Sequence, residues 1–352
     1  MSTTPANPAS GRHGPGTPAP AVLAVDIGGT KTTAAVVRGD GLVTARVTAP
    51  TPAARGGAAV LETALGLART AAAETAAAGS AAPVAIGFGT AGVVGADGRG
   101  IVAATSALPG WAGTRLAAAA ERELRIPATV LNDVQAFLAG ECAAGAARTA
   151  SVAVAVMAGT GVGGALAVGG RVLRGARGAA GHLGHLPVPG AERLPCPCGA
   201  AGHVEALASG PAMTARARAL LPGRDLPDLR AVAALAHSGD FAARTVLEDG
   251  GHALGTALAG VVAALDPDLV VLAGGAVTSG PWYEAGLRAA LAEHTLPLLA
   301  GVPVVRSALD ADAVLLGAAA EARVLLRAAA PGAPGLMVQD HAAGVPESAG
   351  VL

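Results

Sequence analysis

The sequence contains the same local pattern twice. Residues 22–50, VLAVDIGGTKTTAAVVRGDGLVTARVTAP, combine an apolar run, a glycine turn and two further β-rich segments. This pattern predicts a three-stranded meander with Asp26 at the end of its first strand. A second apolar run at 152–156 leads into AGTGVGG at 158–164 and again continues in strand-forming residues. The repetition indicates an internal duplication, with one copy in each of two domains.

Both glycine turns suit an anion. Glycine lacks a Cβ, so backbone N–H groups can approach a phosphate closely. The Thr30 hydroxyl adds a donor, and Asp26 could hold Mg²⁺ directly or through water. A plain hairpin with Gly-Gly in its turn is the alternative for the first copy. Neither copy is a P-loop, because G-K-[ST] is missing, and the second is followed by a strand, unlike a Rossmann fingerprint.

Residues 181–205 bring histidines and cysteines close together in the sequence. His185, Cys196, Cys198 and His203 supply two imidazoles and two thiols, a ligand set typical of a closed tetrahedral zinc site. Core cysteines or a disulfide are the alternatives, but a gap of one residue strains a disulfide. The flanking prolines and glycine favour a tight zinc knuckle.

Two acidic positions suggest substrate chemistry. Glu205 follows the knuckle, where its carboxylate could accept hydrogen bonds from sugar hydroxyls; the alternative is an acidic residue in the first turn of a helix. Asn132-Asp133 lie where a predicted strand at 128–131 gives way to a helix from Val134. Asp133 is therefore a helix N-cap candidate, or the carboxylate that accepts a proton during phosphoryl transfer to a hydroxyl.

Composition excludes several classes of protein. A chain of 352 residues with a formal net charge of −1 can form two domains and has no basic surface for nucleic acid. The apolar stretch Leu254–Leu265 is too short for a membrane span and stops at Asp266. Residues 1–20 lack the apolar core of a signal peptide. With three cysteines, two of them assigned to metal, we expect a cytoplasmic protein.

Taken together, these segments resemble the ROK family of repressors and sugar kinases, and the similarity covers nearly the whole globular part. LAVDIGGTKTTAAVV resembles the first phosphate loop of the family, MAGTGVGGALAVGG its second, and LNDVQAFLAGE its catalytic segment. GHLGH and CPCGAAGHVEALASG resemble its sugar and zinc signature, and VVLAGGAV its nucleoside-binding turn. The resemblance implies an α/β, actin-like (ribonuclease H-like) two-domain ATPase fold.

The resemblance also implies roles for individual residues. The family phosphorylates the 6-hydroxyl of a hexose or N-acyl hexosamine with ATP and Mg²⁺, and Asp133 would be the general base. The implied sugar contacts are Asn132, Asp133, His182, His185, Glu205 and Gly92. The implied ATP and phosphate contacts are Asp26, Gly28, Gly29, Thr30, Lys31, Gly159, Thr160, Gly161, Gly274 and Gly275. His185 would serve both zinc and sugar, one ring nitrogen for each.

Short motifs bear on the sugar. Family glucokinases usually carry E-x-G-H and N-L-P-G-W, where this chain has HLGH at 182–185 and ALPGW at 107–111. Bacterial N-acetylmannosamine kinases resemble A-G-H-x-G-H followed by V-E-A-x-A-S-G, which 180–185 and 204–210 match. The resemblance favours N-acetylmannosamine, in the breakdown of sialic acid and amino sugars. Glucose, N-acetylglucosamine and fructose are the alternatives, and His182 could instead be only a surface or zinc-adjacent residue.

The predicted organisation completes the hypothesis. We expect loose tails at 1–20 and 329–352, a small α/β domain at 21–132 plus 311–328, and a large α/β domain at 133–310. The family's usual homodimer is expected, without nucleic acid or membrane partners. A family repressor would carry a helix-turn-helix before Val22, but the residues there are too rich in Pro and Gly to be helical. Repressors also tend to lose the aspartate that stands here at 133.

Overall fold

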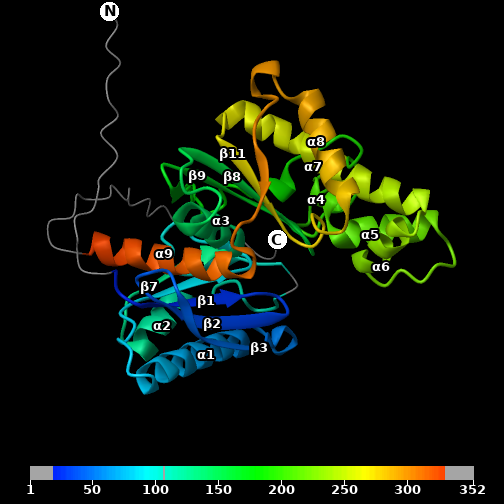
Figure 1. Ribbon diagram of the computed structural model, residues 1–352. Helices are drawn as coiled ribbons and strands as arrows, with labels where there is room; N and C mark the ends of the chain where they lie inside the picture. Colours follow the sequence, from blue (N-terminus) through cyan, green and yellow to red (C-terminus); the bar gives the residue numbers. More distant parts are fainter. Residues whose placement is uncertain (1–18, 106–107, 330–352) are drawn as a thin grey trace, which may run out of the picture.

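The computed structural model describes residues 19–105 and 108–329 (Figure 1). The predicted tails lie outside these residues apart from positions 19, 20 and 329, and so does Ala107 of the ALPGW segment. Among the described residues, no helix is both long and apolar enough to cross a membrane.

The first lobe is built on a five-stranded sheet with the order β3-β2-β1-β4-β7. The antiparallel strands β1 (Val22–Ile27), β2 (Lys31–Val37) and β3 (Val43–Pro50) form the predicted meander. β4 (Ile86–Thr90) and β7 (Ala128–Asn132) continue the sheet parallel to β1.

The second lobe repeats this topology with the order β10-β9-β8-β11-β12. β8 (Val152–Ala158), β9 (Val162–Val168) and β10 (Arg171–Val172) are antiparallel neighbours. β11 (Leu269–Ala273) and β12 (Val304–Arg306) lie parallel to β8. Both sheets thus use one strand order, as the repeated sequence pattern predicts for an internal duplication.

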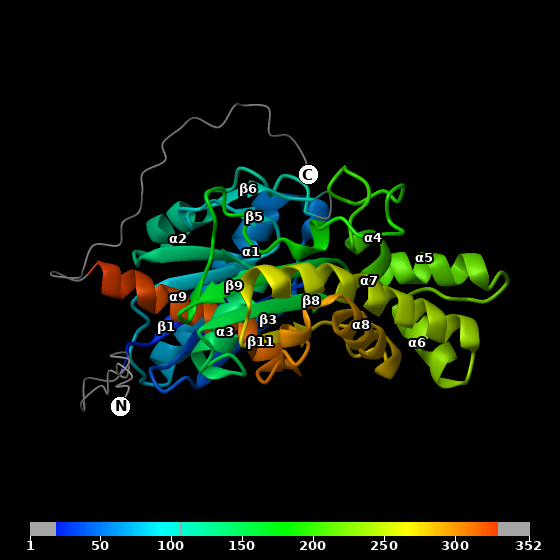
Figure 2. The same ribbon diagram turned by 90° about the horizontal axis from the view of Figure 1, so that it is seen from above.

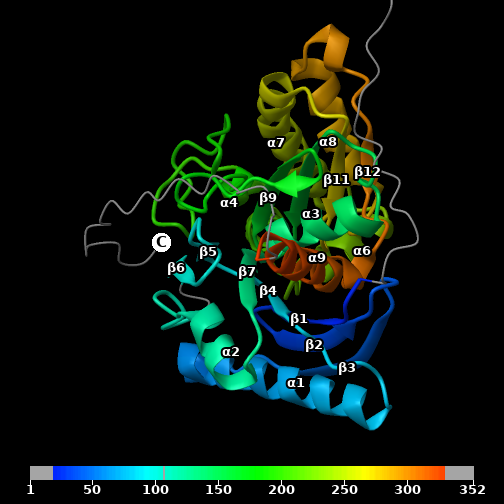
Figure 3. The same ribbon diagram turned by 90° about the vertical axis from the view of Figure 1, so that its left-hand side faces the viewer.

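Helices cover both sheets in layers, because alternate strand residues face opposite sides. α1 (Gly57–Ala77) and α2 (Leu116–Leu124) pack on the face that carries Leu23 and Val25. α9 (Ala313–Ala328) packs on the opposite face, against Val22 and Ala24. Figure 1 and Figure 3 show α9 between the two sheets together with α3 (Asp133–Ala144).

The far face of the second sheet carries the remaining long helices. They are α5 (Gly210–Leu220), α6 (Leu229–His237), α7 (Phe241–Leu265) and α8 (Pro281–His294). Figure 2 shows α5 and α6 at the end of the molecule that lies away from α9. The short elements are β5 (Val93–Val94), β6 (Ile101–Ala103), α4 (Glu205–Ala208), η1 (Ala53–Arg55), η2 (Leu183–His185), η3 (Pro297–Leu299) and η4 (Asp310–Asp312).

The two helices between the sheets touch backbone to backbone. A Cβ on Gly317 of α9 would lie 1.7 Å from the carbonyl oxygen of Ala136, and one on Gly140 of α3 would lie 2.0 Å from that of Ala313. A Cβ on Gly87 of β4 would lie 1.9 Å from the carbonyl oxygen of Ala318. Glycine is therefore required at three points where α9 meets α3 and the first sheet.

This contact makes Gly317→Ala destabilising. The added methyl group must push α9 away from α3, at a cost of about 1–3 kcal/mol in unfolding free energy. Gly260→Ala in α7 is the matched control, since no atom outside its own helix lies within 4 Å of the position and alanine favours helices by about 0.5–1 kcal/mol. Unfolding midpoints should fall for the first variant and rise for the second. Equal midpoints for both variants would refute the tight contact.

Candidate active site

The parallel strands of the first sheet bring distant site residues to one edge. Asp26 of β1 pairs with Gly89 of β4, and Thr90 pairs with Asn132 at the end of β7. The carboxyl ends of the three strands therefore lie side by side, the edge where α/β sheets commonly bind ligands. Asp26 and the Asn132-Asp133 pair, far apart in the sequence, become neighbours there.

Asn132, rather than Asp133, caps α3. The Asn132 Oδ1 accepts hydrogen bonds from the backbone N–H groups of Val134 (3.0 Å) and Gln135 (3.4 Å), and the Gln135 Oε1 accepts from the Asn132 N–H (3.3 Å). This is a capping box. The N-cap prediction for Asp133 is thus wrong by one residue, because Asn132 is extended (φ −62°, ψ 152°) while Asp133 is already helical.

The side-chain amide nitrogen of Asn132 connects this residue to Gly92, another predicted sugar contact. Its Nδ2 donates a hydrogen bond of 3.0 Å to the carbonyl oxygen of Gly92, which follows β4 and has a positive φ of 100°. This bond uses one of the two amide hydrogens of Asn132, and the same side chain also donates to the Asp133 carboxylate. Nearby, the fully buried Trp111 donates from Nε1 to the hydroxyl of Thr90 at 3.0 Å and so fixes the loop that follows β4.

Two carboxylates at this edge have raised pKa values. Burial raises the pKa of Asp133 to about 6, although hydrogen bonds from the N–H groups of Val134 and Asp133 itself and from the side chain of Asn132 oppose the shift. Burial also raises the pKa of Asp26 to about 6, with a further contribution from the charge of Asp133 and an opposing one from Lys31. The two carboxylates therefore interact, and a cation between them would relieve their repulsion.

The first glycine turn is a hairpin turn between β1 and β2. The Gly28 N–H donates to the carbonyl oxygen of Lys31 at 3.0 Å, and Gly29, Thr30 and Lys31 are exposed. Thr51 braces the turn, since its hydroxyl donates to the Gly28 carbonyl oxygen (2.7 Å) and its N–H to that of Thr30 (2.9 Å). A hairpin and an anion cradle are thus compatible in one turn. Thr51 carries no signal in the sequence that marks it as part of the site.

The second glycine turn meets the turn after β11. The Gly159 N–H donates to the carbonyl oxygen of Gly161 at 2.8 Å, and Gly159 accepts from the N–H of Gly210 at 2.8 Å. Gly274 has φ +101°, and a Cβ there would lie 2.2 Å from the carbonyl oxygen of Ala158. Only glycine fits this approach, which places Gly275 beside Gly159.

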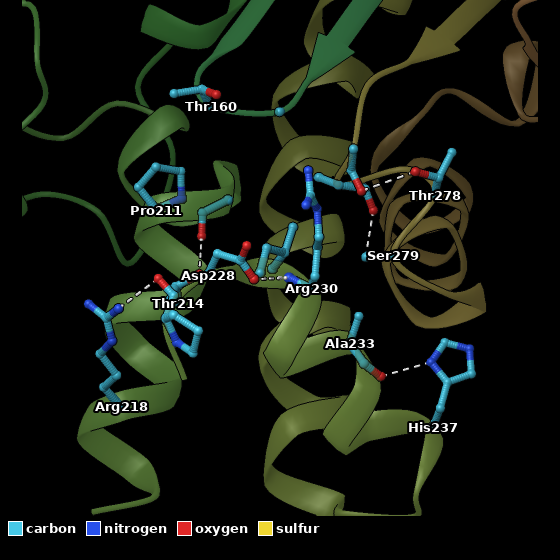
Figure 4. Close-up of a pocket in the computed structure, with 16 residues that line it drawn as sticks. Thr160, Pro211, Thr214, Arg218, Asp228, Arg230, Ala233, His237, Thr278 and Ser279 are labelled. Carbon is cyan, nitrogen blue, oxygen red and sulfur yellow. Dashed lines mark hydrogen bonds between the residues drawn. The ribbon is translucent and has the colours of Figure 1, made fainter. Parts of the chain in front are cut away.

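A cavity of about 820 Å³ opens from these two turns (Figure 4). Its walls come from the turn at 159–160, the loop at 275–279, and helices α5 and α6. The lining residues that the sequence did not identify include Pro211, Thr214, Arg218, Asp228, Arg230, Ala233, His237, Thr278 and Ser279. No local pattern marks these residues, since exposed polar positions on amphipathic helices are common.

Arg230 is the cation of this cavity that is available for a ligand. Arg218 donates to the carbonyl oxygens of Leu226 (2.8 Å) and Pro227 (2.9 Å), and the His237 Nδ1 lies 2.7 Å from that of Ala233. The Arg230 guanidinium has no hydrogen bond or ion pair to any described residue, and it extends from α6 into the cavity (Figure 4). The cavity therefore suits a ligand that carries both an apolar ring and negative charge.

The predicted zinc ligands come together. The four ligand atoms of His185, Cys196, Cys198 and His203 lie within 4.8 Å of one another. The Cys198 Sγ is 3.2 Å from the His203 Nδ1, and the Cys196 Sγ is 3.5 Å from the His185 Nδ1. Zinc bonds of about 2.3 Å to sulfur and 2.0 Å to nitrogen put tetrahedral ligands roughly 3.5 Å apart. Both cysteines are free thiols, so the residues fit a structural Zn²⁺.

Glu205 links the knuckle to the second glycine turn. It is the first residue of α4, as the helical alternative requires, but its Oε2 also accepts a 2.7 Å hydrogen bond from the N–H of Val162. Burial raises the pKa of this carboxylate, and the bond from Val162 opposes the rise. The Oε1 of Glu205 accepts no hydrogen bond from the described residues and so remains available to a ligand.

The start of β9 is where the site residues converge. A Cβ on Gly163 would lie 2.6 Å from the Val134 side chain, next to Asp133, and one on Gly184 would lie 1.8 Å from the carbonyl oxygen of Val162. The His182 Nδ1 is buried without a hydrogen-bond partner among the described residues, and its ring stacks on that of His185 at 6.3 Å. Residues 162–163, at the start of β9, are therefore in contact with the segments that carry Asp133, Glu205 and the two histidines.

Comparison with known proteins yields matches over most of the chain. Residues 22–324 match the model of the ROK family. The chain is 36% identical over 304 residues to the bifunctional enzyme NanE/NanK of Brucella melitensis, covering 86% of this chain but only 54% of that protein, so it spans about half the length of this relative. It is 32% identical to the N-acetylmannosamine kinase of Shigella boydii, covering 84% of this chain and 96% of that one.

Solved structures agree with the fold class. A ROK hexokinase from Thermus thermophilus is 33% identical with a TM-score of 0.76, covering 87% of this chain and 99% of its own. A ROK glucokinase from Streptomyces griseus, solved with glucose and AMPPNP, is 26% identical with a TM-score of 0.73, covering 86% and 99%. These neighbours confirm the actin-like α/β fold that the sequence motifs imply.

The geometry of the knuckle predicts one tightly held zinc per chain. Elemental analysis of tag-free protein, dialysed against a weak chelator, should find one zinc in the wild type and none in Cys196→Ser/Cys198→Ser. Cys142→Ser, which changes the thiol on α3, should keep the metal. A strong chelator should lower the unfolding temperature of the wild type, because the knuckle loses its cross-link. Metal-free wild-type protein with an unchanged unfolding temperature would refute the assignment.

Proposed function

Because the chain belongs to the ROK family, we propose that it is a sugar kinase that transfers the γ-phosphate of ATP to the 6-hydroxyl of N-acetylmannosamine. One observation supports the proposal: the half-buried carboxylate of Asp133 follows β7 at the sheet edge where β1 leads into the first glycine turn, and its neighbour Val134 contacts the start of β9, which follows the second turn. A phosphoryl transfer to an alcohol needs this combination of parts, since it requires positioning, charge neutralisation and a proton acceptor.

The nucleotide would occupy the cavity of the second lobe. Apolar groups such as Pro211 and Ala233 would contact the base, and Arg230 would compensate the phosphate charge. The backbone N–H groups of 29–30 and 160–161 would hold the phosphates from both sides, because those of Gly28 and Gly159 are used within their own turns. Asp26 would hold Mg²⁺ directly or through water, a role that its repulsion with Asp133 supports. When bound, Mg²⁺ neutralises charge on the phosphoryl group.

Asp133 would act as the general base. The sugar O6 forms a bond to the γ-phosphorus while the bond from that phosphorus to the bridging oxygen breaks, and ADP leaves with the electron pair. The hydroxyl proton passes to the Asp133 carboxylate. A pKa of about 6 leaves this carboxylate ionised at neutral pH, yet makes it a stronger base than an exposed aspartate.

The sugar would lie against the knuckle. The His185 Nδ1 faces the cysteines, so its Nε2 remains for a sugar hydroxyl. The Oε1 of Glu205 and the side chains of Asn132 and His182 would supply further contacts. An imidazole at 182 in place of the carboxylate usual in family glucokinases alters which hydroxyls are recognised near the acyl-bearing carbon.

Two classes of alternative remain testable. The hexokinase and glucokinase neighbours make glucose a second candidate substrate, together with N-acetylglucosamine. The presence of Asp133 favours an enzyme over a repressor. We also propose the domain limits 21–132 plus 311–328 and 133–310, and a homodimer as the working assembly.

A sugar panel tests the substrate. With ATP and Mg²⁺, ADP release should show the highest kcat/KM for N-acetylmannosamine, ahead of N-acetylglucosamine, glucose and fructose. His182→Glu should shift the preference toward glucose, whereas His237→Gln, in the nucleotide cavity, should leave the order of sugars unchanged. If glucose is the preferred sugar of the wild type, the N-acetylmannosamine assignment fails but the kinase assignment stands.

Asp133→Asn tests the base. We expect kcat to fall by about 10²–10⁴-fold while sugar affinity changes little, because the amide keeps the shape but cannot take the proton. Wild-type kcat/KM should drop as the pH falls through about 6, where Asp133 becomes protonated. Asp225→Asn, an exposed aspartate, is the control. Retained turnover would remove Asp133 from the mechanism.

The same variant has a stability signature. The folded-state pKa of Asp133 lies above its ordinary value of 3.8, so ionisation costs the folded protein stability at neutral pH. Asp133→Asn should therefore raise stability at pH 7, by on the order of 1 kcal/mol, and this gain should vanish near pH 4, where the wild-type carboxyl is protonated in the folded state. Thermal unfolding at both pH values measures it.

A further inference from the structure

Helices α7 and α8 form a rigid pair on the surface of the second lobe (Figure 1, Figure 3). A Cβ on Gly251 would lie 1.8 Å from the carbonyl oxygen of Tyr283, and one on Gly255 would lie 2.3 Å from that of Leu287. From the other side, a Cβ on Gly286 would lie 2.1 Å from the carbonyl oxygen of Glu248. The helices thus touch backbone to backbone, which fixes the positions of the residues beside the contact.

Three metal-ligating side chains lie on the solvent side of this pair. His252 comes from α7, next to Gly251, and Glu293 and His294 are the last two residues of α8. One ligand atom from each of the three lies within 4.8 Å of the others. The His252 Nε2 is 3.7 Å from the Glu293 Oε2, and the imidazole rings of His252 and His294 are 6.0 Å apart at an angle of 84°.

The donor set matches a first-row divalent transition metal. Such ions prefer imidazole and accept carboxylate oxygen, with bonds of about 2.0–2.2 Å to zinc, which puts ligand atoms on one ion roughly 3.4 Å apart. The ligand atoms are therefore at most about 1.4 Å farther apart than on a shared ion, and rotation of the exposed side chains closes that gap. Nearby arginines do not compete, because Arg288 pairs with Glu284 and Arg216 with Asp249.

We propose that His252, Glu293 and His294 bind one divalent transition-metal ion, such as Zn²⁺ or Co²⁺, which joins α7 to the end of α8. Water completes the coordination, since the three side chains are exposed or half-buried. The site is distinct from the zinc knuckle in having no thiolate and in exchanging its ion with solvent. It stabilises the helix pair from which the 275–279 wall of the cavity leads, because α8 begins directly after that loop at Pro281.

Cobalt distinguishes the two sites. Tag-free protein with zinc in its knuckle is titrated with Co²⁺, and bound metal, visible absorption and unfolding temperature are recorded. We expect one Co²⁺ per chain with weak d–d bands and no thiolate charge-transfer band, together with a rise in unfolding temperature. His252→Asn/His294→Asn should weaken Co²⁺ binding by at least tenfold, and Glu293→Gln should weaken it less.

The controls separate this site from the rest of the chain. His13→Asn/His341→Asn, which removes the other two histidines outside the knuckle and the cavity, should bind Co²⁺ as the wild type does. The His252→Asn/His294→Asn protein should keep its knuckle zinc, its metal-free unfolding temperature and its kinase activity, which shows that it folds. Absence of a second metal in the wild type, Co²⁺ binding unchanged in that variant, or a thiolate band from the added ion would each overturn the proposal.

Discussion

The contact between α3 and α9 fixes the relation between the two lobes. Both helices lie between the sheets, and glycines at 140 and 317 allow their backbones to touch. α3 begins at Asp133, so the packing that joins the lobes also sets the position of the carboxylate. Val134, the next residue, reaches Gly163 at the start of β9 in the second lobe. The geometry of the site therefore depends on how closely the two helices approach each other. A side chain larger than hydrogen at position 140 or 317 would change both the helix contact and the position of Asp133.

Burial of the two carboxylates raises their pKa values and makes their ionisation energetically costly. Burial raises the pKa values of Asp26 and Asp133 to about 6, and the charge of Asp133 contributes to the shift of Asp26. An ionised carboxylate in this environment is less stable than one in water, and the same property would make Asp133 an effective proton acceptor in the proposed reaction. The capping box of Asn132 satisfies backbone N–H groups at the start of α3. The energetic cost at this point is therefore that of ionising the carboxylates, and the helix itself is regular.

The second lobe brings together two clusters of side chains of the kinds that bind metals. The knuckle ligands lie on a loop whose Val188, Ala191 and Val204 pack into the core of the lobe, and Glu205 connects this loop to β9 through the Val162 N–H. The second cluster, at His252, Glu293 and His294, depends instead on two helices already held together by glycine contacts. The four knuckle residues lie close together in the sequence, whereas the second cluster joins a residue of α7 to two residues of α8.

The sequence by itself determined the strands, the glycine turns, the clustering of two histidines and two cysteines, and the family. These features depend on local rules: alternation along strands, the missing Cβ of glycine, and the softness of thiol and imidazole ligands. Only the tertiary structure decided that Asn132 rather than Asp133 caps α3, that α5 and α6 form the cavity wall with Arg230 unpaired, and that His252 meets Glu293. Such contacts depend on the packing of whole elements, and exposed residues carry no local pattern that reveals which neighbours packing will give them.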